Sequence, residues 1–290
     1  MELRVGSWNV EGRLSDSGVT NRGKPSQIVA AIKKLDADIL VLLEAHSEDS
    51  IDNLTCRKQL NDMGYYLKSV NYQDDMTSRK DTYAKQLSLI LLSKLPIDKF
   101  EIIRLGDFRN AFVAIIHNDK ANWSLRVIGL HLDDRLESTR LKQIADLSNV
   151  INQSSLPTVV MGDFNAMHGD DLWPAKFLNS KFIHKLSGVI LPKISKKAVG
   201  MASGDTLHML QARTNLRDAD MQHKPTTTPK MRGLEWMPSI RLIQIDHIFL
   251  SSNIQVEQFQ IAPDAGADHR AITAILQLSD TLDDIATSVQ

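Results

Sequence analysis

Short apolar runs alternate with helical patterns along this 290-residue chain, and the two patterns predict different elements. Continuous or alternating apolar runs are typical of strands, whereas apolar residues three and four positions apart are typical of amphipathic helices. The expected strands are residues 3–10, 38–43, 64–70, 86–92, 100–105, 111–117, 124–132, 158–161, 242–250, 254–261 and 271–278. The expected helices are residues 26–35, 49–63, 135–151 and 170–178.

The spacing of these elements predicts the fold class. Several central strands follow one another too closely for a helix to fit between them, so they should pair antiparallel. Sheets that pack one face on helices and the other on a second sheet explain both the alternating and the continuous apolar runs. We therefore expect an α/β fold, a layered sandwich with two packed mixed β-sheets, formed as a single domain over residues 1–290.

Residues 181–241 differ from the rest of the chain in charge and in composition. They contain 11 Lys and Arg against 4 Asp and Glu, a local charge of +7 in a chain whose net charge is −1, and they are rich in Gly and Pro. This composition predicts a partly irregular excursion with a solvated basic surface. If the substrate is a nucleic acid, lysines and arginines of this segment would contact its phosphate backbone. The cations concerned are Lys193, Lys196, Lys197, Arg213, Arg217, Lys230 and Arg232.

The overall composition excludes several classes of protein. With 42% apolar and 24% charged residues the chain can bury a large core, so disorder is excluded. The apolar runs are far shorter than the roughly 20 residues of a membrane span, and the N-terminus has the pattern of a first strand, not of a signal peptide. Cys56 is the only cysteine, so no internal disulfide can form. We expect a cytoplasmic protein without a membrane span, and a monomer.

Polar residues stand at the ends of the expected buried strands. A single such residue is usually a turn or helix cap, but strand ends of one sheet pair share a rim, so several of them together predict a site. The residues are Asn9, Glu44, His131, the segment 162–165 (GDFN), Asp246 and the pair Asp268 and His269.

This set of side chains suits the cleavage of a phosphate ester with a hard cation. Carboxylate and amide oxygens without a thiolate favour Mg²⁺ or Mn²⁺ over Zn²⁺. A further carboxylate can activate water, and imidazoles can donate to phosphoryl oxygens as charge develops. Other chemistries are poorly supported: Cys56 lies on an expected helix, and the chain has no Gly-x-Ser-x-Gly elbow, no phosphate-binding Gly-x-x-x-x-Gly-Lys and no His-Glu-x-x-His.

The same residues, taken in order, resemble a known family. The series SWNVEG (7–12), LLEAHS (42–47), GLHLDD (129–134), GDFNA (162–166), IDHIF (245–249) and ADHRAI (267–272) is similar to the endonuclease/exonuclease/phosphatase superfamily of DNase I-like phosphoesterases. The resemblance spans residues 3–278 and implies a four-layered α/β/β/α sandwich.

The resemblance also implies a role for each residue. Glu44 would be the main metal ligand, with Asn9 and Asp268 beside it. Asp163 would activate water, and Asn165 would bind phosphate. His269, oriented by Asp246, and His131 would be the catalytic imidazoles, and a looser match places Arg109 on the substrate phosphate.

Some positions depart from the family pattern or carry no role. Leu43 stands where the family usually has Gln, so a hydrogen bond near the metal is missing or comes from elsewhere. Glu11 is a possible contributor to a second metal site. We expect His46 and Asp133 to be solvent-facing polar residues. Trp8 and Trp123 should lie in the core, and Trp173 and Trp236 near the substrate.

Three functions are compatible with this pattern. The first is a nuclease that hydrolyses phosphodiesters of DNA or RNA. The second is a phosphatase or phosphodiesterase for a small-molecule or lipid phosphate, because these enzymes share the chemistry and differ in their loops. The third is a binding module that holds phosphorylated ligands without turnover. Because the absence of a signal peptide and of disulfides argues against a secreted enzyme, the cytoplasmic nuclease is favoured.

Overall fold

The computed structural model describes residues 2–11, 14, 25–46, 54–71, 87–106, 109–168, 204–226 and 243–278. Within them lie two sheets and four helices, and no helix of this part of the chain is long and apolar enough to cross a membrane. The helices are α1 (Pro25–Leu35), α2 (Leu54–Asp62), α3 (Glu137–Ile151) and α7 (Asp205–Thr214).

Each sheet has six strands among the described residues and is mixed. In spatial order the first contains β11 (Ile254–Ile261), β12 (Ile272–Leu278), β1 (Glu2–Asn9), β2 (Ile39–His46), β4 (Leu87–Ser93) and β3 (Tyr66–Asn71). The second contains β5 (Ile97–Leu105), β6 (Arg109–Asn118), β7 (Trp123–His131), β8 (Thr158–Asp163), β10 (Asp246–Leu250) and β9 (Arg217–Asp218). One strand pair in each sheet is parallel, β1 with β2 and β7 with β8, and the other pairs are antiparallel.

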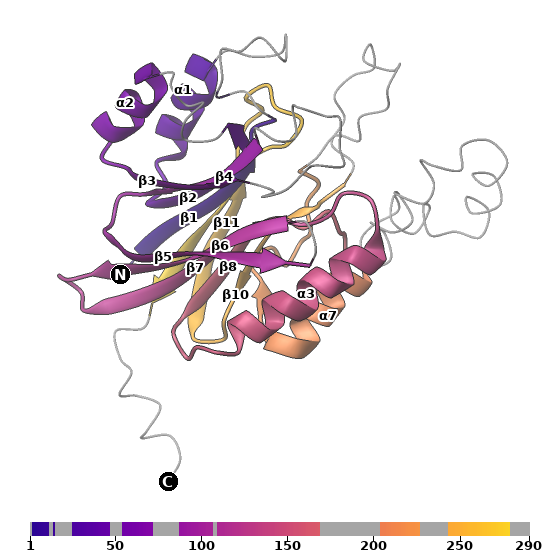
Figure 1. The fold of residues 1–290 in the computed structure, drawn as a ribbon. Coiled ribbons are helices and arrows are strands. Elements are labelled where there is room, and N and C mark those ends of the chain that lie inside the picture. The colour runs from indigo at the N-terminus through magenta and orange to yellow at the C-terminus, as the bar shows by residue number, and fades with distance from the viewer. Residues whose placement is uncertain are drawn as a thin grey trace, which may run out of the picture.

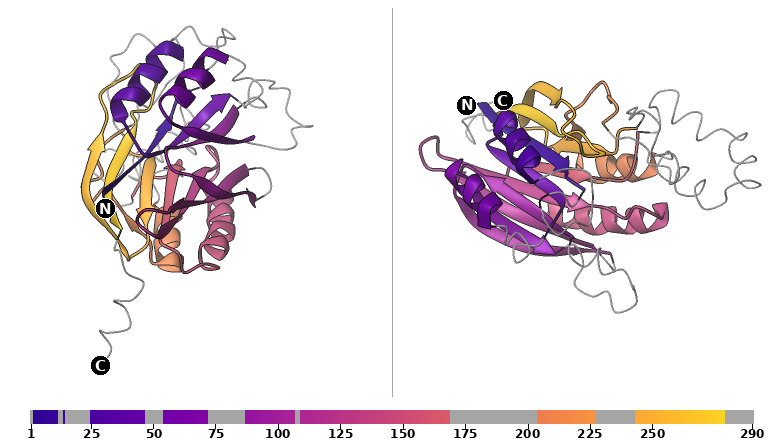
Figure 2. Two further views of the ribbon diagram at one scale, coloured as in Figure 1. Left: turned by 90° about the vertical axis from the view of Figure 1, so that its left-hand side faces the viewer. Right: turned by 90° about the horizontal axis from the view of Figure 1, so that it is seen from above.

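The elements stack in four layers. Helices α1 and α2 cover the outer face of the first sheet, α3 and α7 cover the outer face of the second, and the sheets pack on each other between them (Figures 1 and 2). Alternation along β2 shows how the sequence achieves this, because successive strand residues point to opposite faces. Val41 and Leu43 lie between the sheets, whereas Leu40 and Leu42 pack under the helices. The predicted α/β/β/α sandwich is confirmed.

Most of the expected elements are present, with ends shifted by a few residues. The strand expected over residues 242–250 begins only at Asp246, and the helix expected over 49–63 spans Leu54–Asp62. The helix expected over 170–178 lies outside the described residues. Trp8 and Trp123 lie in the core as predicted, with 1% and 8% of their surface exposed; Trp173 and Trp236 lie outside the described residues.

The excursion expected at about 181–241 has to be revised where it is described. Residues 204–226 belong to the layers: α7 packs on α3 and buries Leu207 and Leu210, and β9 pairs with β10. This segment was missed because Gly- and Pro-rich surroundings hide one short helix and a strand of only two residues. Residues 181–203 and 227–241 lie outside the described part of the chain.

Candidate active site

The strand ends bring the expected residues from both sheets to one edge. Asn9 ends β1, and His131 and Asp163 end the neighbouring parallel strands β7 and β8, in register with each other. Asp246 begins β10, which runs antiparallel to β8, and is the direct partner of Asp163. Asp163 and Asp246 are nearly fully buried, so their charges act on each other with little screening by water.

One oxygen atom is the geometric centre of the site. Asp163 Oδ2 lies 3.4 Å from Asn9 Nδ2, 3.4 Å from His131 Nε2 and 3.9 Å from His269 Nε2. Burial raises the pKa of Asp163 to about 7, helped by the charge of Asp246 and opposed by His269. A carboxylate that takes up a proton near pH 7 is suited to accept one from an attacking water.

His269 is held by a carboxylate on its far side. Its Nδ1 donates to Asp246 Oδ2 at 2.8 Å, and the same oxygen accepts from the Thr226 hydroxyl at 2.9 Å. Burial disfavours the charged ring, but Asp246, Asp163 and Asp268 outweigh burial and raise the pKa of His269 to about 10. His269 is therefore an imidazolium at neutral pH, with Nε2–H directed towards Asp163.

Glu44 leaves the regular strand geometry at a bulge. The register of β2 against β4 shifts between Leu42 and Ala45, and Glu44 adopts a left-handed φ of 52°. Such a bulge redirects a side chain, and a left-handed non-Gly residue at a site signals strain of order 1 kcal/mol. The side chain of Glu44 stays 27% exposed, and its Oε1 lies 4.0 Å from His131 Nε2.

The charge around Glu44 favours a cation. Burial and the neighbouring Asp268 raise the pKa of Glu44, whereas a hydrogen bond from Asn9 lowers it. Asn9 thus supplies the polar contact that Leu43 cannot make, since Leu43 is fully buried between the sheets. Two carboxylates that repel each other are oxygen donors for Mg²⁺ or Mn²⁺, while the Asn9 oxygen here accepts the backbone N–H of Glu11 at 3.1 Å.

The GDFN segment depends on a glycine and on a left-handed asparagine. A Cβ on Gly162 would lie 1.9 Å from the carbonyl oxygen of Leu130, so only glycine lets β8 approach β7 here. Asn165, with φ of 49°, donates its backbone N–H to Asp163 Oδ1 at 2.8 Å and its amide Nδ2 to Leu132 O at 3.1 Å. Its side-chain amide therefore braces the segment after β8 against the residue that follows β7.

Arg109 is buried beside the site, with 4% of its surface exposed, and its Nη2 lies 3.4 Å from Asp134 Oδ1. Burial lowers its pKa, while Asp134, Asp133, Glu44 and Asp163 oppose this, and an arginine remains a cation throughout. The guanidinium is thus in the field of the same carboxylates.

Asp268 is half-buried next to His269 and acts electrostatically on both Glu44 and His269.

Some contributors were not anticipated from the sequence. Thr226 lies in the Gly- and Pro-rich stretch 181–241, yet its hydroxyl donates to Asp246 Oδ2. Trp8, expected only as a core residue, donates its indole N–H to the backbone oxygen of His269 at 3.1 Å. Asp133 is half-buried and accepts hydrogen bonds from two backbone N–H groups that lead into α3, so it is a turn-forming residue more than a solvent-facing one. The side chain of His46 lies outside the described part.

Two cations expected to serve the site lie elsewhere. Arg217 pairs with Leu250 at the end of β10 opposite Asp246, about 13 Å along the strand from the site. The backbone of Arg213 accepts a hydrogen bond from Asn152, just beyond the last turn of α3. Both arginines therefore lie away from the rim, and their contact with the phosphates of a nucleic acid stays a prediction. The remaining cations of that prediction lie outside the described residues.

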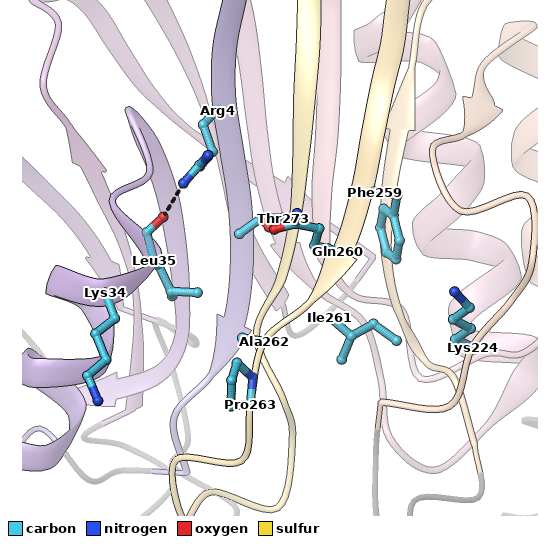
Figure 3. Close-up of a pocket in the computed structure, with 10 residues that line it drawn as sticks. All are labelled: Arg4, Lys34, Leu35, Lys224, Phe259, Gln260, Ile261, Ala262, Pro263 and Thr273. Atoms are coloured by element: carbon cyan, nitrogen blue, oxygen red, sulfur yellow. Dashed lines mark hydrogen bonds between the residues drawn. The ribbon is translucent and has the colours of Figure 1, made fainter.

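A basic groove of about 420 Å³ lies along the edge strand β11, away from this site. Figure 3 shows Arg4 and Lys34 on one side of it and Lys224 across the strand, with Phe259 and Ile261 between. None of the nine expected site residues lines it. Arg4 is held there by Leu35, whose carbonyl accepts from Nη1 at 3.1 Å.

Comparison with known proteins agrees with the geometry. The model of the Endonuclease/Exonuclease/phosphatase family matches residues 6–280. No curated protein matches the chain significantly. Among solved structures, an endonuclease/exonuclease/phosphatase from Bacteroides vulgatus has 16% identity and a TM-score of 0.65, covering 96% of this chain and 100% of that one.

Two further solved structures carry named activities. ANGEL2, a 2′,3′-cyclic phosphatase, has 18% identity and a TM-score of 0.63, with 95% of each chain covered. The mannosyl-6-phosphatase Bt3783 of Bacteroides thetaiotaomicron has 16% identity and a TM-score of 0.58, covering 95% of this chain and 100% of that one. At these identities the likeness concerns the fold.

Proposed function

Because the chain belongs to the endonuclease/exonuclease/phosphatase family, whose members are phosphoesterases, we propose that its site hydrolyses a phosphodiester of DNA or RNA by attack of water. The observation that carries this proposal is the convergence of Asn9, His131 and His269 on one oxygen of Asp163. A water-activating carboxylate surrounded by nitrogen donors suits the attack of water on an anionic phosphate.

The cation would be held by Glu44, Asn9 and Asp268. The set fits Mg²⁺ or Mn²⁺, since both carboxylates offer oxygens and Asn9 would contribute the amide oxygen that here accepts the Glu11 N–H. Burial and the repulsion from Asp268 raise the pKa of Glu44, and a positive ion would relieve that repulsion. When bound, such an ion neutralises charge that develops on the phosphoryl oxygens.

The chain's own groups account for the proton movements. Asp163 takes a proton from the attacking water on Oδ2, while the backbone N–H of Asn165 holds its other oxygen in place. His269, kept protonated by Asp246, and His131 donate to the phosphoryl and leaving oxygens as the P–O bond breaks. Arg109 adds a positive charge that attracts the substrate phosphate.

A substrate panel tests the proposal. The enzyme is incubated with Mg²⁺, Mn²⁺ or EDTA and with each of five substrates. These are bis-p-nitrophenyl phosphate, single-stranded DNA, duplex DNA, RNA and phosphorylated inositols. We expect cleavage of the diester and of a nucleic acid with either cation and none in EDTA. Asp163→Asn and His269→Ala should each lose more than about tenfold, roughly 1.4 kcal/mol of barrier. His117→Ala is the matched control, since His117 lies near the opposite end of β6 from Arg109.

Salt dependence tests whether the substrate is a nucleic acid. In an Asp163→Asn background, affinity for a 12-mer DNA is measured against salt with and without the triple change of Lys193, Lys196 and Lys197 to Ala. If these lysines bind phosphates, the log–log slope should fall by about one per lysine. Parallel slopes with unchanged affinity would contradict the basic-segment part of the proposal.

The second candidate function is hydrolysis of a small-molecule phosphate. It is favoured by the position of Arg213 and Arg217, which lie away from the rim where a small substrate would bind. It is also compatible with the activities named for ANGEL2 and Bt3783. Turnover of a phosphorylated sugar or inositol with no cleavage of nucleic acid would select it. Tight phosphate binding without turnover under any divalent cation would select the non-catalytic module instead.

We also propose that the enzyme is a cytoplasmic monomer and that residues 1–290 form one domain. Cys56, the only thiol, is 3% exposed in the helix layer over the first sheet. Sedimentation at several concentrations and a single cooperative unfolding transition test the last two points, and cell fractionation tests the first.

A further inference from the structure

A second cluster of ionisable groups lies behind the GDFN segment. Asp218 of β9 places its Oδ2 2.7 Å from Nδ1 of His247 and 3.0 Å from Nε2 of His168. His247 is fully buried and Asp218 is 5% exposed. The three residues come from β9, from β10 and from the segment that follows β8, so one carboxylate joins three separate parts of the chain.

The hydrogen-bond partners determine the protonation of His247. Its Nε2 lies 3.0 Å from the carbonyl oxygen of Ala166, which can only accept, so Nε2 carries a proton. Its Nδ1 faces a carboxylate oxygen at 2.7 Å, where two lone pairs would repel, so Nδ1 carries a proton as well. Burial opposes the charged ring, but the charge and hydrogen bond of Asp218 raise the pKa of His247.

A metal ion explains this cluster less well than hydrogen bonds do. Ligand atoms of Asp218, His168 and His247 lie within 4.8 Å of one another. Around a tetrahedral zinc ion, bonds of 2.0–2.1 Å keep ligand atoms about 3.3 Å apart, whereas the observed 2.7 and 3.0 Å are hydrogen-bond distances. His223 stacks on His168 at 3.9 Å with rings 4° apart, and two parallel rings cannot both direct in-plane lone pairs at one ion.

The cluster fixes the segment that carries two site residues. Asp218 binds the ring of His168 directly and binds the backbone of Ala166 through His247, so it holds this segment at two points. This segment is residues 163–168, and Asp163 lies at its start. Because successive strand residues alternate in direction, His247 points to the helix side while its neighbour Asp246 points to the site. Strand β10 thus holds His269 with one residue and the GDFN segment with the next.

We propose that Asp218 is a positioning residue: through His247 and His168 it holds Asp163 in place against the Asp246–His269 pair. This inference rests on the proposed phosphoesterase activity and concerns turnover, not substrate affinity. A displacement of about 1 Å at a reacting group can cost up to roughly 100-fold in rate. Removal of the hydrogen-bonded hub, which is Asp218 with its bonds to His247 and His168, should therefore lower kcat and leave KM nearly unchanged.

The test compares Asp218→Leu with Asp218→Asn in the full chain. Hydrolysis of bis-p-nitrophenyl phosphate with Mg²⁺ gives kcat and KM, and hydrogen–deuterium exchange reports the backbone of residues 163–168. We expect Asp218→Leu to lower kcat by about 10- to 100-fold with KM within about twofold, and to speed exchange at residues 163–168. Asp218→Asn should stay within about threefold of the wild type, since its amide still bonds His247. Asp38→Leu is the matched control, a carboxylate that accepts the backbone N–H of Arg4 far from the site.

Each outcome decides the matter. A wild-type rate in folded Asp218→Leu, or a rise in KM alone, overturns the positioning role. If the wild type hydrolyses no substrate, the proposed function fails, and the exchange comparison still tests the hub. If Asp218→Leu does not fold, His247→Phe fills the same space without either N–H and should show the same kcat loss and faster exchange. One metal ion per chain that is lost on Asp218→Asn would overturn the hydrogen-bonded hub.

Discussion

Replacement of Asp246 by Asn should convert His269 from a permanent cation into a group that titrates near neutrality. The two side chains are buried and 2.8 Å apart, and Asp246 is the largest of the influences that raise the pKa of His269 to about 10. An amide keeps the shape of the carboxylate but removes its charge. Burial then opposes the charged ring with only Asp163 and Asp268 favouring it, so the pKa should fall from about 10 towards the ordinary 6.5.

The expected rate loss follows from the fraction of protonated His269. With a pKa of 6.5, about 3% of the ring is protonated at pH 8, about a quarter at pH 7 and about three quarters at pH 6. If the imidazolium is the active form, Asp246→Asn should lower kcat/KM about 30-fold at pH 8 and about fourfold at pH 7. At pH 6 the loss should be less than about twofold.

The assay is the ratio of variant to wild-type kcat/KM at each pH, with bis-p-nitrophenyl phosphate and saturating Mg²⁺. The ratio cancels effects of pH on substrate and cation that both proteins share. Asp119→Asn is the matched control, because Asp119 contacts His117 at 3.2 Å on the exposed surface. A ratio that does not change between pH 6 and 8 would refute the role of a protonated His269.

The same pair predicts how stability depends on pH. Since the folded pKa of His269 lies above the unfolded value of 6.5, its contribution is complete below pH 6.5 and is lost as pH rises through about 10. The shift corresponds to roughly 5 kcal/mol across this window. Urea unfolding in EDTA should show the decline in the wild type and a much smaller one in Asp246→Asn.

Three further predictions concern the cation, the GDFN turn and a helix end. Glu44→Gln should lower kcat more than about tenfold and weaken Mg²⁺ binding measured by calorimetry, whereas Glu101→Gln on the exposed edge strand β5 should change neither. Gly162→Ala should lower the free energy of unfolding by about 1–3 kcal/mol or more, because its Cβ would overlap the carbonyl oxygen of Leu130. Arg126→Met should lower stability by about 1–3 kcal/mol in thermal unfolding without changing kcat, since this guanidinium donates to the last two carbonyls of α3.

The layers could be predicted from the sequence because the apolar period is strong in most elements. Each long strand and the helices α1 and α3 have a clear pattern, and the polar residues at their ends lie where that pattern stops. The site residues could be named because they flank such strands. What failed was the segment with weak local signal: α7 and β9 are defined by their packing on α3 and β10, which the local sequence does not encode.

The contacts that refine the site could not be predicted for the same reason. The bulge at Glu44 extends β2 to His46, although the apolar run ends at Leu43. A bulge arises from the pairing with β4, so it leaves no mark in the run itself. Thr226 and Asp218 belong to segments without an apolar period, and their partners are tertiary neighbours.

The pairing of β12 with β1 affects how the chain folds while it is synthesised on the ribosome. The indole N–H of Trp8 donates to the backbone oxygen of His269, 261 positions later in the chain. At a translation rate of about 5–20 residues per second, His269 is therefore synthesised roughly 13–50 s after Trp8. During that interval β1 has β2 on one side and an open edge on the other. Such an edge is a template for aggregation, and the long separation makes closure slow. The nascent chain should therefore stay inactive and dependent on chaperones until β12 emerges.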